Sequence, residues 1–309
     1  MGDLLGRCRF PPSGTAVVCA VSGGADSLAL LLLSVDAGLE VTAVHVDHGL
    51  RPGSAAEASV VAAAAALLGA RFERRSVAVA PGPNLEARAR AARYGALPPG
   101  VLTGHTADDV AETMLVNLLR GAGLDGLSPM RPQAALNGAS PVRESAARVV
   151  RPLLALRRAE TGALCRARGL APVEDPSNSD PRFVRNRVRH DLLPLLADIS
   201  GRDVVPVLVR QAELLGADAD FLDDVAASLD PTDARALAAA PLVVGRRAVR
   251  RWLQHSAPER HPPSAAEVDR VLEVARGATR GCELTARRRV GRSKGRLTLT
   301  CDEAGGAPS

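Results

Sequence analysis

Short apolar runs alternate with longer runs of helical length through the first 150 residues of the chain. Each short run has the length and composition of a buried β-strand, and each longer run is long enough for a helix. Repetition of this unit predicts an α/β fold in which a doubly wound parallel sheet is covered by helices on both faces. The expected strands are 15–21, 40–46, 71–80 and 100–105, and the expected helices are 26–38, 54–69, 84–97 and 107–121.

The pattern after residue 148 predicts the end of this first domain. An apolar run at 148–156 and a helical run at 157–169 lead into a polar, proline-bearing loop over 174–189. That loop is longer than a routine connection and is therefore expected to be functional. A helical run at 190–199 follows, so we predict a catalytic domain over residues 1–198.

Residues 199–309 have a different pattern, which predicts a smaller, mainly helical domain. Its segment 282–301 alternates apolar and polar residues like a β-hairpin that turns near 291–295. The final segment, 302–309, has the composition of a disordered tail. The expected helices lie at 203–229, 242–256 and 264–277.

Charge distinguishes the second domain from the rest of the chain. Residues 240–300 hold 14 Lys or Arg against 5 Asp or Glu, a balance of 14 − 5 = +9, so the remainder of this +5 chain carries 5 − 9 = −4. Such a segment is either a solvated surface or a footprint for nucleic acid, and composition alone leaves both open. Aromatic residues are few, so affinity for RNA would come mainly from phosphate contacts.

Composition also argues against several classes of protein. No run of about 18 apolar residues occurs, and the N-terminal segment has no long apolar stretch, so we expect a cytoplasmic protein without membrane insertion. The five cysteines form no C-x-x-C pair, which disfavours zinc and iron–sulfur sites, and Cys19 is expected in the core. No Gly-Lys pair occurs, which excludes a Walker phosphate loop.

A glycine-rich turn joins the first expected strand to the first expected helix. Backbone N–H groups of such a turn point at an anion, the helix dipole favours negative charge, and glycines leave room for a phosphate group. Asp26 would repel a phosphate unless a cation lay between them, which indicates Mg²⁺. The alternative is that Asp26 and Ser27 only cap the helix. The turn consists of Ser22, Gly23, Gly24, Ala25, Asp26 and Ser27.

This turn resembles the PP-loop of the ATP pyrophosphatase family, whose members split ATP between the α and β phosphates and adenylate an oxygen of their substrate. Five further segments, in the same order along the chain, resemble the tRNA(Ile)-lysidine synthase family within that superfamily. One departure is Ser128-Pro129, where that family usually has glycine before the methionine. The segments are HVDHGLR at 45–51, NLEARARAARY at 84–94, GHTADDVAET at 104–113, NLLRGAGLDGL at 117–127 and EDPSNSDPRFVRNRVR at 174–189.

The resemblance implies a two-step ligase reaction with ATP and Mg²⁺ as cofactors. The C2 oxygen of the wobble cytidine in a tRNA(Ile) with the anticodon CAU is adenylated, and the amino group of free L-lysine then displaces AMP to give lysidine. The resemblance also implies a short form with one C-terminal domain that binds the tRNA. It leaves open whether the protein is a homodimer.

The same resemblance implies roles for residues near the turn. The turn would hold the departing pyrophosphate, with Asp26 both catalytic and bound to Mg²⁺. Arg93 would contact the tRNA or substrate, and His45 would contact the nucleotide, although a satisfied, half-buried histidine is the alternative. The implied ATP-binding residues are Ser22, Gly23, Gly24, Ala25, Asp26, Ser27, His45 and Arg90.

Two acids of the GHTADDVAET segment are the candidates for recognising lysine. Asp109 and Glu112 lie three residues apart at the start of a helix, so their carboxylates share one face. The resemblance implies that they bind the ammonium groups of lysine, or a metal, with Asp108 as the next candidate. The alternative is that these acids only complement the helix dipole.

The RFVRNRVR run supplies a third group of candidates. Arg185 is expected to be catalytic, and Asn186 and Arg189 are expected to contact the tRNA or substrate. Guanidinium groups at this spacing suit the phosphates of RNA or ATP. The alternative is a structural surface helix.

Three other functions remain as alternatives at the level of sequence. A tRNA cytidine thiolase would be expected to have C-x-x-C cysteines, which this chain lacks. A small-molecule amidating ligase of the same superfamily would explain the glycine-rich turn, but neither the 174–189 segment nor the basic 240–300 segment. A non-enzymatic RNA-binding module would not need an intact phosphate-binding turn.

Overall fold

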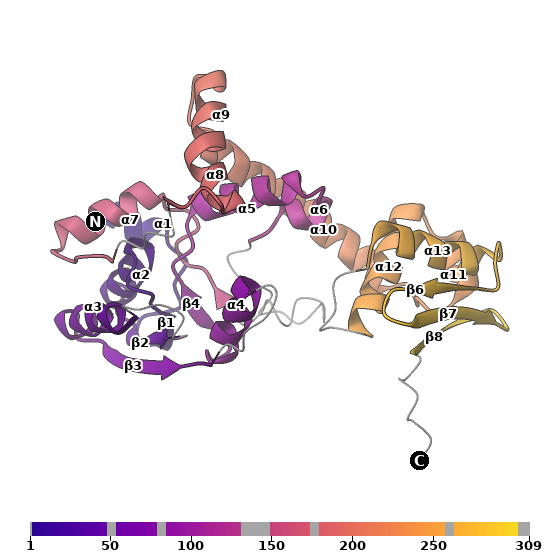
Figure 1. Ribbon diagram of the computed structural model, residues 1–309, viewed down its shortest axis with the longest axis horizontal. Helices are drawn as coiled ribbons and strands as arrows, with labels where there is room; N and C mark the ends of the chain where they lie inside the picture. The colour runs from indigo at the N-terminus through magenta and orange to yellow at the C-terminus, as the bar shows by residue number, and fades with distance from the viewer. Residues whose placement is uncertain are drawn as a thin grey trace, which may run out of the picture. The chain divides into compact units, whose positions relative to one another are not determined.

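The computed structural model describes residues 2–47, 54–78, 85–130, 149–173, 179–256 and 263–301, in two compact units (Figure 1). The first unit ends at Gly216 and the second begins at Ala217. The division falls inside the long helix α10 (Val205–Ala227), whereas the sequence predicts it after residue 198. Helical periodicity continues through this junction, so the pattern gives no signal there.

Within the described residues of the first unit, five parallel strands form one sheet in the order β3-β2-β1-β4-β5. Ala16 pairs with Glu40 across β1 and β2, and Cys19 pairs with Leu102 across β1 and β4. This sheet confirms the predicted α/β fold. The order reverses between β1 and β4, and ligands bind beyond the carboxyl ends of strands at such a point. The strands are β1 (Ala16–Ala20), β2 (Glu40–Asp47), β3 (Arg71–Ser76), β4 (Val101–Thr103) and β5 (Val149–Val150).

Helices cover both faces of this sheet, as predicted (Figure 1). One face, through Val17 and Cys19 of β1, packs against α2, α3 and α7, and Cys19 is fully buried as expected. The other face, through Val18 and Ala20, packs against Tyr94 of α4. The helices are α1 (Gly2–Arg7), α2 (Ala25–Asp36), α3 (Ser54–Leu67), α4 (Leu85–Gly95) and α7 (Arg158–Ala167).

The helices that follow β4 carry the GHTADDVAET and RFVRNRVR segments. Val110 of α5 packs against Ala212 of α10, and α5 also contacts Val188. The segment predicted as a loop over 174–189 is helical from Val184 onward, because apolar residues at a spacing of four bury Val188 against α5. The elements are α5 (Ala107–Leu119), α6 (Leu124–Leu127), α8 (Val184–Arg187), the π-helical turn η3 (Val188–Leu192) and α9 (Leu193–Ser200).

The second unit consists of helices and a small antiparallel sheet. The predicted hairpin is formed by β7 and β8, with Lys294 and Gly295 in the left-handed conformation at its turn. The prediction missed β6, because Ala286 and Arg287 form the second left-handed turn without the glycine or asparagine that usually signals one. The elements are α11 (Ala234–Ala239), α12 (Leu242–His255), α13 (Ala265–Arg276), β6 (Gly281–Leu284), β7 (Arg288–Ser293) and β8 (Arg296–Cys301).

Several predicted features lie outside the described residues. They are the end of the HVDHGLR motif at 48–51, the start of the EDPSN segment at 174–178, and the predicted tail at 302–309. Among the helices that the structure describes, none combines the length and the apolar character that a membrane span requires.

Candidate active site

The glycine-rich turn connects β1 to α2 at the carboxyl edge of the sheet. Gly23 has a φ angle of +92°, a conformation that favours glycine. The Ser27 hydroxyl donates to the Gly24 carbonyl (2.8 Å) and accepts from the Ser22 backbone N–H (3.2 Å). Gly24 precedes the helix, and no side chain caps its first turn. Gly24 therefore occupies the N-cap position, and Asp26 and Ser27 lie inside the first turn of α2.

Gly104, directly after β4, lies against the start of α2. A Cβ atom at this position would be 2.5 Å from the carbonyl oxygen of Asp26 and 3.0 Å from the backbone nitrogen of Ser27. Any larger residue would therefore displace the turn. The turn and the end of β4 meet at the point where the strand order reverses, which is where the sheet topology places a ligand.

A cavity of about 800 Å³ opens beside the turn. This volume suits a nucleotide-sized ligand. His45 lines the cavity and is only 2% exposed. Its Nδ1 lies 3.0 Å from the Val21 carbonyl oxygen, and its Nε2 is buried without a hydrogen-bond partner among the residues that the structure describes. His45 is thus buried with one ring nitrogen satisfied by the backbone and the other unsatisfied. Arg93 and Tyr94 also line the cavity.

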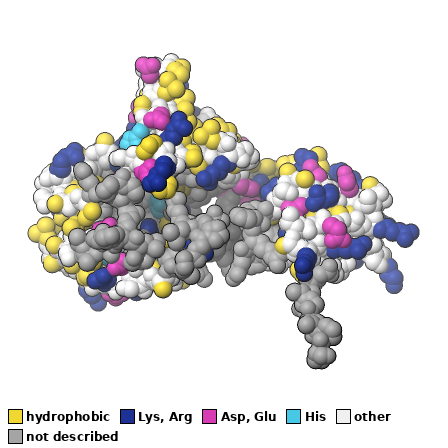
Figure 2. All heavy atoms as spheres, viewed as in Figure 1, with side chains coloured by type: hydrophobic (Ala, Val, Ile, Leu, Met, Phe, Trp, Pro, Cys, Tyr) yellow, Lys and Arg dark blue, Asp and Glu magenta, His cyan; other side chains and the backbone are white. Residues whose placement is uncertain are grey.

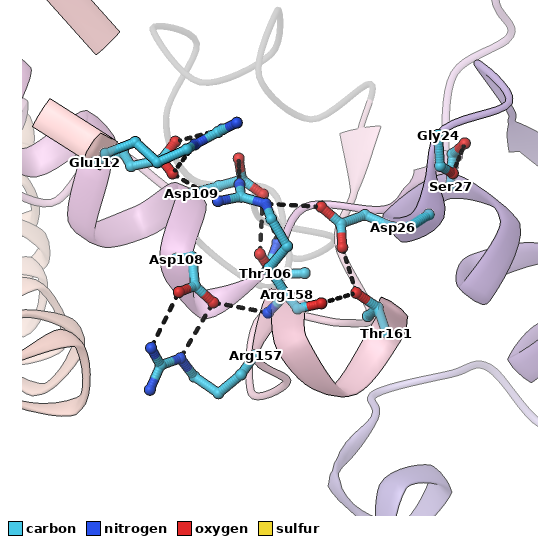
Figure 3. Close-up of polar contacts among 12 residues, drawn as sticks. Gly24, Asp26, Ser27, Thr106, Asp108, Asp109, Glu112, Arg157, Arg158 and Thr161 are labelled. Carbon is cyan, nitrogen blue, oxygen red and sulfur yellow. Dashed lines mark hydrogen bonds and ion pairs between the residues drawn. The ribbon is translucent and has the colours of Figure 1, made fainter. Parts of the chain in front are cut away.

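Arg158, the first residue of α7, links the turn to the acids of α5 (Figure 3). Its guanidinium group donates to three carboxylates that come from two different helices. They belong to Asp26 (3.2 Å), Asp109 (3.0 Å) and Glu112 (2.7 Å). Asp109 and Glu112 therefore lie on one face of α5, as predicted from their spacing.

Two further arginines complete the network around Glu112. Arg185 donates to Asp109 (2.8 Å) and to Glu112 (2.9 Å). Arg189 donates twice to Glu112, at 2.7 and 3.0 Å. The three carboxylates and three guanidinium groups balance in formal charge, so the network is neutral as a whole.

Glu112 is fully buried, and its pKa is lowered to about 2. Burial alone would raise this pKa, but hydrogen bonds from Arg189 and the charges of Arg158, Arg189 and Arg185 outweigh it. Glu112 is therefore a permanent anion near neutral pH.

Asp26 behaves in the opposite way, because its pKa is raised above the usual value. Burial is the main cause, and the neighbouring charge of Asp109 adds to it; the Thr161 hydroxyl and Arg158 oppose the shift. Thr161 donates to the Asp26 carboxylate (Figure 3). The free site thus does not fully compensate the charge of Asp26.

The remaining acid of the α5 segment, Asp108, faces a different set of partners. It accepts two hydrogen bonds from Arg157, at 3.0 and 3.1 Å, and one from the backbone N–H of Arg158 (2.8 Å). Asp109, in addition to its arginine contacts, accepts from the backbone N–H of Thr106 (2.8 Å) and so caps α5. Helix capping is thus part of the role of Asp109, alongside its place in the network.

The structure places the other predicted site residues as follows. Arg93 reaches the cavity, while the side chain of Arg90 lies outside the described residues. Asn186 is buried and donates to the Asp180 carbonyl (2.9 Å), so it anchors the segment before α8. In this structure Arg185 and Arg189 bind carboxylates, although the sequence predicts phosphates as their partners.

Sequence reasoning missed Arg157, Arg158, Thr161 and Gly104. The first three lie at the start of α7, soon after the short strand β5. Ligands bind beyond the carboxyl ends of parallel strands, and applying that rule to β5 would have pointed to this helix. No strand was predicted there, because β5 is very short: within the described residues it consists of Val149 and Val150 alone.

Residues 7–196 match the family model described as the PP-loop domain. The fold, the glycine-rich turn and this match define a protein of the PP-loop class. The chain is also 42% identical to the tRNA(Ile)-lysidine synthase of Nocardia farcinica, over 94% of this chain and 93% of that protein. It is 41% identical to the same enzyme of Rhodococcus erythropolis (92% and 89% covered) and 40% identical to that of Gloeobacter violaceus (78% of each). The chain belongs to the tRNA(Ile)-lysidine synthase family.

A solved structure supports the fold alone. The U34-tRNA thiolase of Methanococcus maripaludis, determined with its [4Fe-4S] cluster, matches with a TM-score of 0.53 at 18% identity. The match covers 69% of this chain and 74% of that one.

Proposed function

We propose that the protein uses ATP to adenylate the C2 oxygen of the wobble cytidine in a CAU-anticodon tRNA(Ile) and then attaches lysine at C2 with loss of AMP, giving lysidine, AMP and pyrophosphate. The observation that carries the proposal is that one site contains both a turn suited to phosphates and acids suited to an amine. A phosphate-binding turn and a cluster of acids that can bind a cationic amine are joined through Arg158. Membership of the lysidine synthase family supplies the substrates.

The turn would perform the first half of this reaction. Backbone N–H groups at the start of α2 would bind the departing pyrophosphate, and the helix dipole favours its charge. His45 Nε2, for which the described part of the chain offers no hydrogen-bond partner, would hydrogen-bond the nucleotide. The C2 oxygen of cytidine leaves easily only after it is esterified by phosphate, so holding the two reactants together is the main task of these residues.

The site also fits Mg²⁺ in the mode that this ion prefers. Among the described residues no cluster of three or more metal-ligating side chains occurs. Mg²⁺ bound to a nucleotide needs only one or two carboxylates, because phosphate oxygens and waters supply the rest. Asp26 lines the cavity, lies within the phosphate-binding turn and has an undercompensated charge, so it is the residue that would hold the ion. Bound there, Mg²⁺ would neutralise charge on the phosphates.

The acids of α5 would perform the second half of the reaction. Glu112 remains ionised at neutral pH and Asp109 faces the same cavity as the turn. Two carboxylates on one helix face can hold an ammonium group of lysine near the adenylated base. Arg185 and Arg189 would fix these carboxylates and offset their charge until the amine arrives.

We assign tRNA binding to the C-terminal region, predicted from the sequence as residues 199–309. Basic side chains are visible on the surface of the second unit in Figure 2, interspersed with acidic ones. Arg280 and Lys294 are exposed at the same end of the small sheet, where the start of β6 pairs with the end of β7. Such groups would bind tRNA phosphates. A cytoplasmic location and a homodimer stay predictions.

Incorporation of labelled lysine tests this function. The protein is incubated with ATP, Mg²⁺, labelled L-lysine and a transcript of tRNA(Ile) with the anticodon CAU. We expect label to enter this tRNA and not the methionine tRNA, which has the same anticodon. Absence of incorporation under all conditions would refute the proposal.

A further inference from the structure

We propose that Arg158 is a positioning residue whose guanidinium group occupies the acceptor atoms of the amine-binding acids, Asp109 and Glu112, until the nucleotide binds. Lysine would therefore bind after Mg²⁺ and ATP. This inference rests on the proposed function and concerns the order in which the same site is filled. It starts from the position of one guanidinium group among three carboxylates that serve two different substrates.

Arg158 occupies the hydrogen-bonding positions that an ammonium group would need. Its two terminal nitrogens donate to one oxygen of Asp109 and to one oxygen of Glu112. A primary ammonium carries three donors and one positive charge, so it can replace these two bonds and this charge one for one. In the free site, therefore, the arginine itself stands where the amine of the substrate would bind.

The three acids differ in what they lose when Arg158 leaves. Glu112 keeps Arg185 and Arg189, and Asp109 keeps Arg185. Among the side chains that the structure describes, Asp26 keeps only the hydroxyl of Thr161 as a partner. Asp26 is therefore the acid that most requires a new cation when the arginine moves.

The nucleotide and its cation would weaken one interaction of the Arg158 side chain and offer it another. A cation on the Asp26 carboxylate competes directly with the Nε atom of Arg158, which lies 3.2 Å from that carboxylate. The phosphates that accompany the cation are themselves strong partners for a guanidinium group. Binding at Asp26 thus lowers the free energy of moving Arg158 away from Asp109 and Glu112.

The main chain allows this movement of the side chain alone. The backbone N–H of Arg158 donates to the Asp108 carboxylate (2.8 Å), which Arg157 also holds through two hydrogen bonds. The start of α7 is thus fixed independently of the guanidinium group. The side chain is 28% exposed, so it has access to the cavity. Departure of the side chain opens acceptor positions on Asp109 and Glu112 without unfolding the helix.

Calorimetric titration of lysine tests this coupling. Lysine is titrated into the full chain alone and into the chain saturated with Mg²⁺ and α,β-methylene-ATP, which resists cleavage between the α and β phosphates. In the unmodified protein we expect the nucleotide analogue to tighten lysine binding by roughly tenfold or more, within the usual range of coupling between sites. Equal lysine affinity with and without the analogue would overturn the proposal.

Two variants at Arg158 make the test specific. In Arg158→Gln the coupling should fall to within about threefold, because lysine already binds without nucleotide. In Arg158→Lys, whose point charge cannot span three carboxylates, an intermediate coupling is expected and keeps the test valid if the glutamine variant does not fold. Full coupling in both variants would refute the role of Arg158.

A matched control and a second readout separate this inference from the proposed function. Arg168→Gln, at the other end of the α7 region, removes a pair with Asp36 and should retain full coupling. Lysine incorporation into tRNA(Ile) is measured in parallel. Incorporation without coupling would reject only the role of Arg158, whereas absence of incorporation in the unmodified protein would reject the proposed function itself.

Discussion

At the scale of single residues, Asp26 and Glu112 show how one network gives two carboxylates opposite properties. Burial and Asp109 raise the pKa of Asp26, whereas three arginines lower the pKa of Glu112 to about 2. Raised and lowered pKa values side by side mark functional sites. The charge of Asp26 is thus undercompensated, whereas the charge of Glu112 is compensated by its arginines.

We therefore predict that Asp26→Asn removes activity without reducing stability. A carboxylic acid whose folded pKa is raised disfavours the folded state when it is ionised, so the neutral amide should leave the melting temperature unchanged or higher. Release of pyrophosphate from ATP in the presence of tRNA should fall by roughly a hundredfold or more. A lower melting temperature with normal pyrophosphate release would contradict both parts.

Glu112 should make the stability of the protein depend on acid pH. Its pKa is about 2 in the folded state and near the ordinary value of 4.5 when unfolded, so its contribution is complete above the unfolded value and is lost as the pH falls toward 2. At pH 7, Glu112→Gln should lower the free energy of unfolding by about 3 kcal/mol, because it leaves three half-buried arginines without this counter-charge.

Urea unfolding between pH 7 and pH 3 checks this prediction. The difference between the unmodified protein and Glu112→Gln should shrink as the pH falls. The exposed Glu213, changed to Gln on α10, is the matched control and should show no such trend. A difference that is independent of pH would mean that Glu112 contributes through packing and not through its charge.

At the scale of elements, the end of β4 and the start of α2 are bound together by a close backbone approach. Gly104 provides this approach, because its missing side chain lets the Asp26 carbonyl lie where a Cβ would be. The short β4 therefore positions the phosphate-binding turn as well as extending the sheet. The GHTADD motif thus contributes to two parts of the site. Its glycine allows the turn before α2 to approach β4, and its two acids lie in the first turn of α5.

Gly104→Ala should consequently weaken ATP binding indirectly, through displacement of the turn. The added methyl group would displace the turn, with an expected loss of about 1–3 kcal/mol in stability and of roughly tenfold or more in affinity for ATP. Binding of ATP is measured by calorimetry and stability by thermal unfolding. Gly95→Ala is the control, because a Cβ there meets open space within helix α4. Normal ATP affinity in Gly104→Ala would show that the turn adapts.

At the scale of the whole molecule, part of the basic charge of the second unit serves the fold itself. Arg288 is buried and donates to the Leu253 carbonyl at the end of α12, and Arg292 donates to the Ala275 carbonyl at the end of α13. These arginines satisfy helix C-termini. The surplus of charge counted from the sequence is therefore larger than the surplus available to a nucleic acid.

The salt dependence of tRNA binding tests whether the exposed basic groups of the second unit contact tRNA phosphates. The double change Arg280→Glu and Lys294→Glu should weaken tRNA binding and reduce the slope of log K against log salt by about 1 for each phosphate that is no longer bound. Filter binding at several salt concentrations measures this slope. Arg246→Gln is the control, because its guanidinium group is held by Asp269 at 2.7 and 3.0 Å. An unchanged slope in the double variant would exclude this end of the sheet as a tRNA-binding surface.

The sequence by itself determined the features that depend on neighbouring residues. Strand and helix periodicity is local, so the strands β1 to β4 and the helices beside them could be predicted from the sequence. The pattern missed the two-residue strand β5, the turn before β7 that lacks glycine, and the helical end of the segment expected as a loop. The phosphate-binding turn is also local, because two glycines and a following helix suffice to define it. Spacing along one helix likewise placed Asp109 and Glu112 on the same face.

Only the tertiary structure decided which charged groups meet. Arg158 lies 132 residues from Asp26 in the chain, and no periodicity relates them. Their contact depends on how α7 packs beside α2 and α5, and on which of many arginines is brought to a buried acid. Long-range pairing is set by the packing of complete elements, so the chemistry of each acid, and the role of Arg158 between them, appears only once the chain is folded.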